Sequence, residues 1–98
     1  MKDITELRAE IDAVDSQIIE LFRQRMEISE GVAEYKQSVG KAIYDPERER
    51  QKLVKIGKEA GPELRTGAIM LFSTLFERSS APQLKKMNKH TDLTDRVA

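Results

Sequence analysis

The chain of 98 residues is long enough for one domain, and short enough that association with a second copy would add considerably to its stability. Its 17 basic and 17 acidic residues leave no net charge, which argues against binding to nucleic acid or to an anionic membrane. The absence of cysteine and the single His90 exclude a disulfide framework, a thiolate nucleophile and a histidine-based metal cluster.

Charged residues make up 35% of the chain, whereas runs of β-branched residues and turn dipeptides are scarce. This composition favours long solvated helices over a sheet. The N-terminal stretch is charged and already periodic, so we expect neither a signal peptide nor a membrane-spanning segment, and we expect the protein in the cytoplasm.

The first predicted helix carries an apolar stripe with heptad spacing. Its ten positions, three and four residues apart in turn, are Ile4, Leu7, Ile11, Val14, Ile18, Leu21, Arg25, Ile28, Val32 and Tyr35. We expect the helix to be capped by Asp3 or Thr5 and to run to about Gln37 or Ser38, before Gly40. From Ile4 to Tyr35 it would be ~48 Å long, longer than a compact domain of this size is wide. A second copy of the chain is the expected cover.

Arg25 is the one charged residue in this stripe. A permanent cation in an apolar seam costs several kcal/mol unless an anion meets it. An ion pair with Glu27 or with Asp15 of a second chain would satisfy it, and so would a side chain that bends out to solvent. The alternative is a receptor for a carboxylate of a substrate.

Two shorter helices are expected to follow. Asp45 and Pro46 predict a helix start. The Asp side chain can accept hydrogen bonds from the free backbone amides of the first turn, and Pro lacks only a backbone N–H that would have no partner at this position. Gly61 and Pro62 then end that helix after Ala60. A third helix is predicted to open at Pro62 or Glu63. One broad apolar face of it comprises Leu64, Ala68, Leu71, Phe72, Leu75 and Phe76.

Pro82 is expected to kink or end the third helix around residues 79–83. From Leu84 onward the chain is polar and only weakly periodic. We therefore assign residues 1–90 to one helical domain and residues 91–98 to a polar tail that is expected to be disordered.

Several charged residues lie beside the apolar positions rather than among them. Arg8 and Lys36 flank the stripe in the same phase, 28 residues or ~42 Å of helix apart. Two antiparallel first helices would set Arg8 of one chain level with Lys36 of the other, near Arg25. Each residue on its own is equally well explained as a solvated charge flanking a coiled coil.

Asp45, Arg48 and Glu49 share one side of the first turn of the second helix, where free amides also point outward. Taken alone, this group is explained by a helix cap and a salt bridge within the helix.

Together these residues resemble the all-helical class of chorismate mutase. The resemblance covers about residues 4–83 and uses order and spacing. Its elements are Leu7 and Arg8 with Ile11 and Asp12, the run from Ile18 to Arg25, Lys36, the run from Tyr44 to Glu49, and Ser79 with Gln83. It implies an all-α fold with three helices per chain, a long first helix, and an intertwined homodimer.

The resemblance also implies an isomerase that rearranges chorismate, a small dianion, to prephenate in aromatic amino acid biosynthesis, without metal or cofactor. By similarity, the two carboxylates are held by Arg25 and by Arg8 of the partner subunit, assisted by Arg48 and Ser79. The ether oxygen accepts hydrogen bonds from Lys36 and Gln83, and the ring hydroxyl meets Asp45 and Glu49. Val32 supplies an apolar wall.

Three alternatives stay open: an isochorismate pyruvate lyase, an aminodeoxychorismate mutase, and a helical dimerisation or regulatory module without chemistry. Asp45 and Glu49 favour the mutase over the lyase, because they match acceptors for a ring hydroxyl. Pro82 departs from the family pattern. If this proline displaces Gln83, Lys36 contributes more of the stabilisation of the ether oxygen. Docking onto another enzyme of the pathway is also compatible with the sequence.

Overall fold

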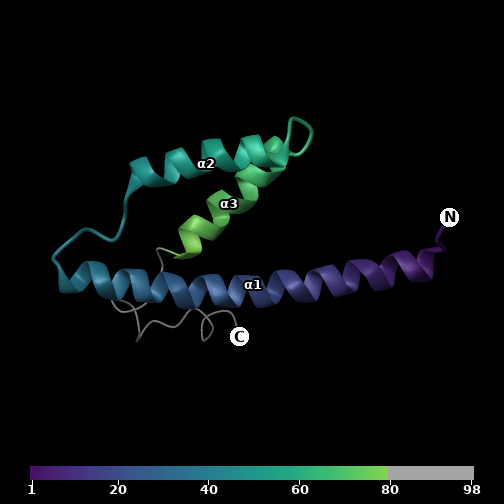
Figure 1. The fold of residues 1–98 in the computed structure, drawn as a ribbon, viewed down its shortest axis with the longest axis horizontal. Coiled ribbons are helices and arrows are strands. Elements are labelled where there is room, and N and C mark those ends of the chain that lie inside the picture. Colours follow the sequence, from purple (N-terminus) through teal and green to yellow (C-terminus); the bar gives the residue numbers. More distant parts are fainter. Residues whose placement is uncertain (80–98) are drawn as a thin grey trace, which may run out of the picture.

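The structure, a computed structural model, describes residues 1–79. Within that range it contains three helices and no strand: α1 (Ile4–Ser38), α2 (Pro46–Ala60) and α3 (Arg65–Ser79) (Figure 1). The prediction of an all-α chain with a long first helix is confirmed. No helix among these residues has both the length and the apolar character that crossing a membrane requires.

α1 begins and ends at the residues that its capping signals indicate. Of the two predicted caps, Asp3 is the one used, because its Oδ1 accepts a hydrogen bond from the backbone N–H of Glu6 at 2.8 Å. At the other end Gly40 has a φ of 72°, a left-handed conformation that favours glycine. The N–H of Lys41 then donates to the carbonyl of Lys36 at 2.8 Å, which closes the helix.

α2 begins as predicted, with the Asp45 carboxylate accepting from the backbone N–H of Arg48 at 3.1 Å. The predicted start of α3 was two or three residues too early, because Pro62 to Leu64 form a turn before Arg65. In this turn the N–H of Leu64 donates to the carbonyl of Gly61 at 3.2 Å. The turn reverses the chain, so that α3 runs back under α2 and meets α1 near its middle (Figure 1).

The side of α1 that packs against α2 and α3 shares only Arg25 with the heptad stripe. The residues of this side are Arg25, Ser29, Ala33 and Lys36, spaced by four, four and three. Ala33 is buried and the other three are half-buried. In the described part of the chain, Ala33 and Phe76 are the only buried apolar side chains. The nine apolar members of the stripe all remain exposed, by 41 to 68%. The chain's own helices therefore leave the stripe uncovered.

α3 buries a narrower face than predicted. Phe76 is buried and Ala68, Phe72 and Leu75 are half-buried, but Leu64 and Leu71 remain exposed. The rings of Phe72 and Phe76 pack edge to face with their centroids 6.3 Å apart. Only one side of α3 contacts α1 and α2, which explains why the broad apolar face is not covered in full.

Gly57 allows the close approach of α2 and α3. It is buried, and a Cβ atom there would lie 3.2 Å from both Arg65 Cγ and Ile69 Cδ1. Gly67 of α3, in contrast, has no neighbouring atom within 4 Å of its Cβ position. The two glycines thus differ in packing, although both are helical.

We expect Gly67→Ala to raise the free energy of unfolding by about 0.5 to 1 kcal/mol, since alanine loses less backbone entropy in a helix. Gly57→Ala should not stabilise the protein, or should destabilise it, because the side chains of Arg65 and Ile69 must move to make room for the new methyl group. Denaturant unfolding of both variants checks the difference. Equal stabilisation by the two substitutions would contradict the close packing of α2 on α3.

Candidate active site

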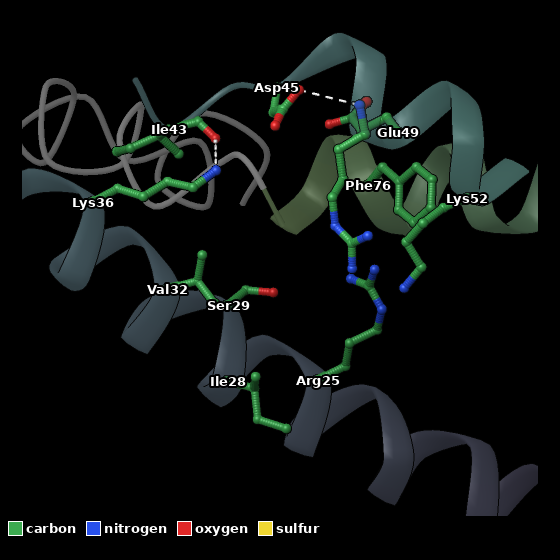
Figure 2. Close-up of a pocket in the computed structure, with 11 residues that line it drawn as sticks. Arg25, Ile28, Ser29, Val32, Lys36, Ile43, Asp45, Glu49, Lys52 and Phe76 are labelled. Atoms are coloured by element: carbon green, nitrogen blue, oxygen red, sulfur yellow. Dashed lines mark hydrogen bonds between the residues drawn. The ribbon is translucent and has the colours of Figure 1, made fainter. Parts of the chain in front are cut away.

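A cavity of about 340 Å³ lies between the C-terminal half of α1, the connection to α2 and the first turns of α2, with one residue of α3 at its edge (Figure 2). Its lining comprises Arg25, Ile28, Ser29, Val32, Lys36, Ile43, Asp45, Arg48, Glu49, Lys52 and Phe76. This volume suits a small organic molecule, since ligand pockets measure roughly 300 to 1,000 Å³.

Arg25 reaches the cavity from the middle of α1. Its Nη1 donates to the hydroxyl of Ser79, which in turn donates to the carbonyl of Leu75 at 2.7 Å. The guanidinium carbon lies 5.3 Å from the ring centroid of Phe76, within range of a cation–π interaction. Arg25 makes no ion pair within residues 1–79, so Glu27 of its own chain does not neutralise it. The guanidinium is held in place but keeps its full charge.

Lys36 enters the cavity from the last turn of α1. Its ammonium donates to the backbone carbonyl of Ile43 at 3.1 Å (Figure 2). This bond ties the connection between α1 and α2 to the lysine and fixes the position of the positive charge. An ammonium has three donors, so further donors remain for a ligand.

The first turn of α2 adds a cation and two carboxylates. Asp45 caps the helix with one oxygen, which holds its carboxylate at the cavity edge. Glu49 is half-buried, and its carboxylate makes no hydrogen bond or ion pair with any other described residue. Arg48 lies between them in sequence and also lines the cavity. Glu49 is thus available to accept from a ligand.

Lys52 also lines the cavity and was not among the predicted site residues. Its ammonium lies 5.9 Å from the ring centroid of Phe76. Burial lowers the pKa of Lys52, and the positive charges of Arg25, Arg48 and Lys55 lower that pKa further, against a smaller opposite effect of Glu59. Lys52 follows Arg48 by four residues and Glu49 by three, so the helical spacing could have identified it.

Ile28, Ser29, Ile43 and Phe76 line the cavity as well and had not been selected as site residues. Ser29 follows Arg25 by four residues, which places both on one face of α1. Phe76 had been assigned to the core alone, but it is both buried and part of the cavity wall.

Four cationic side chains and two carboxylates line the cavity, which leaves an excess of two positive charges at neutral pH. Like charges held this close repel one another unless anions join them. The part of the chain that the structure describes contains no group of acidic or histidine side chains suited to a metal ion. Such an arrangement is suited to bind a small anion with two negative charges.

The remaining candidate residues lie elsewhere. Ser79 contacts Arg25 but does not line the cavity itself. Arg8 is exposed on the N-terminal half of α1, 17 residues or ~26 Å of helix from Arg25, so it cannot reach this cavity within one chain. Gln83 and Pro82 lie outside the described residues.

The sequence model of the chorismate mutase type II family matches residues 7–84 of the chain. The chain belongs to this family. The resemblance that the sequence showed is therefore confirmed. The chorismate mutase match includes all nine candidate residues, from Arg8 at one end to Gln83 at the other, together with the complete cavity lining.

Individual relatives agree with this membership. The chorismate mutase of Methanocaldococcus jannaschii is 34% identical over 86 residues, which cover 85% of this chain and 86% of that protein. The bifunctional chorismate mutase/prephenate dehydratase of Aquifex aeolicus is 36% identical over 62 residues, 60% of this chain but only 17% of the relative. The T-protein of Enterobacter agglomerans is 41% identical over 58 residues, or 16% of that protein. No solved structure matches the chain at a significant level.

Proposed function

We propose that the protein is a chorismate mutase that rearranges chorismate to prephenate in aromatic amino acid biosynthesis. One observation carries the proposal: in a chain of this family, the cavity has an excess of two positive charges that no described residue neutralises. Chorismate carries two carboxylates, so its charge matches that excess. The rearrangement is pericyclic and requires neither a nucleophile nor a general base.

In the proposed mechanism the cationic side chains first select the reactive conformer. The side chain of chorismate must fold over its ring before the new carbon–carbon bond can form. Arg25, fixed by Ser79 and Phe76, holds one carboxylate, and Arg48, which also lines the cavity, assists. Val32 and Ile28 supply an apolar wall against the ring. The energy of binding thus offsets the cost of the folded conformation.

Lys36 then acts on the breaking bond. As the carbon–oxygen bond lengthens, negative charge grows on the ether oxygen, and an ammonium beside it stabilises the transition state more than the ground state. The hydrogen bond to Ile43 fixes this ammonium before the substrate arrives. Gln83 is proposed as a second, neutral donor to the same oxygen. Asp45 and Glu49 are proposed to accept from the ring hydroxyl.

We further propose that the functional unit is a homodimer. The apolar stripe of α1 is exposed along its length, and the N-terminal half of α1 extends beyond the other two helices (Figure 1). A second α1 packed antiparallel would cover the stripe and bring Arg8 of the partner subunit to the cavity, level with Lys36. This cation would bind the second carboxylate, so each site would need both chains.

The activity is tested by incubating the purified protein separately with chorismate, isochorismate and aminodeoxychorismate and identifying the products. We expect prephenate from chorismate, since Asp45 and Glu49 suit its ring hydroxyl, and little turnover of the other two compounds. Pyruvate released from isochorismate, or preferred turnover of the amino compound, would reassign the substrate. No product from any of the three would favour a helical module without chemistry.

Replacing Lys36 by methionine keeps most of the side-chain volume and removes the donor. We expect kcat for chorismate to fall by about 10² to 10³, the usual effect of losing one such donor, while the helical circular dichroism signal is retained. Lys41→Met is the matched control, because Lys41 is exposed and outside the cavity. A kcat within threefold of wild type for Lys36→Met would show that this ammonium does not act on the ether oxygen.

A further inference from the structure

Lys52 is the one cationic residue of the cavity to which the proposed mechanism assigns no part. It lies one helical turn beyond Arg48 on the same face of α2. Figure 2 shows its ammonium extending from α2 toward the guanidinium of Arg25, beside the ring of Phe76. The two cations therefore approach each other from different helices.

Lys52 and Arg25 share the same aromatic ring. The guanidinium carbon of Arg25 lies 5.3 Å, and the ammonium nitrogen of Lys52 5.9 Å, from the centroid of Phe76. A ring quadrupole stabilises each cation, but it does not cancel their charge. The mutual repulsion of the two cations therefore persists until an anion lies between them.

No carboxylate of the described residues fills that position. Neither Lys52 nor Arg25 forms an ion pair within residues 1–79, and Glu59, whose charge acts on Lys52, pairs with Lys55 instead. Burial and the cations around it lower the pKa of Lys52. An anion that binds beside a half-buried lysine repelled in this way stabilises the charged form of that lysine.

We propose that Lys52 is a substrate-binding residue whose ammonium, together with the guanidinium of Arg25, holds one carboxylate of the bound substrate. The inference rests on the proposed function, because it takes the substrate of this cavity to be a dianion. The planar guanidinium fixes the orientation of the carboxylate, and the ammonium adds a point charge from a second direction. Arg8 of the partner subunit then serves the other carboxylate.

The test compares three variants of the full chain. Lys52→Met, which removes the charge at similar volume, is expected to raise the KM for chorismate about tenfold and to change kcat by less than about twofold. Lys52→Arg should restore a KM close to that of wild type. Lys55→Met removes a charge from the next turn of α2, outside the cavity, and should leave both constants unchanged. Lys52→Gln replaces Lys52→Met if the latter fails to fold.

A wild-type KM for Lys52→Met, or equal impairment of Lys52→Arg and Lys52→Met, overturns the inference while the proposed function stands. If wild-type protein does not convert chorismate, the proposed function fails, and calorimetric titration with isophthalate, a rigid dicarboxylate, decides the inference separately. Binding about tenfold weaker in Lys52→Met than in wild type and Lys55→Met supports carboxylate binding by Lys52. Equal isophthalate affinity, or no binding to wild type, overturns it.

Discussion

The stripe of apolar side chains on α1 must be shielded from water, and the chain's own α2 and α3 do not shield it. Those helices pack on a different side of α1, around Ala33, and leave the stripe exposed from Ile4 to Tyr35. α1 therefore has two separate tasks. One side packs on the rest of its chain, and the stripe is available to a second chain. Ile28 and Val32 of the stripe also line the cavity, so the two sides adjoin there. The proposed dimer follows from this division, because burial of apolar surface is the main force that favours association.

Arg25 lies where the two sides of α1 meet. It belongs to the heptad stripe by phase, yet its guanidinium turns toward Ser79 and Phe76 at the cavity. With Lys36, Arg48 and Lys52 it makes a cluster whose repulsion is unfavourable in the empty protein. Such a cluster is retained at a cost to stability where an anion is to be bound. A dianionic substrate would relieve the repulsion and stabilise the fold by mass action.

Helix boundaries were predictable because they depend on local chemistry. Asp3 and Asp45 offer carboxylates to free amides, and Gly40 takes up a left-handed conformation. The start of α3 was misplaced, since Pro62 is as favourable in a turn as at a helix start, and the choice depends on the reversal that packs α3 on α2. Leu71 was assigned to the core because an apolar pattern does not tell which partner covers it.

The cavity lining was predictable where a residue contradicts its pattern, as Arg25 does, or where polar residues share one turn, as Asp45 and Glu49 do. Lys52 was missed because a lysine on a charged helix is usually solvated. Its spacing from Arg48 indicates the shared face of α2, and the contact with Phe76 shows that this face is covered. Arg8 has the right phase on α1, but its proximity to a site depends on a second chain. A single sequence predicts faces of helices more readily than it predicts what lies opposite them.

If each site combines residues of two chains, hybrid dimers should recover activity that neither parent has. Arg8→Gln and Arg25→Gln chains with different affinity tags are produced together, and dimers that contain one of each are purified. We expect both parent homodimers to be severely impaired and the hybrid to recover about half of the wild-type kcat, because one of its two sites lacks both substitutions. A hybrid as slow as its parents, or a fully active Arg8→Gln homodimer, would contradict the shared site.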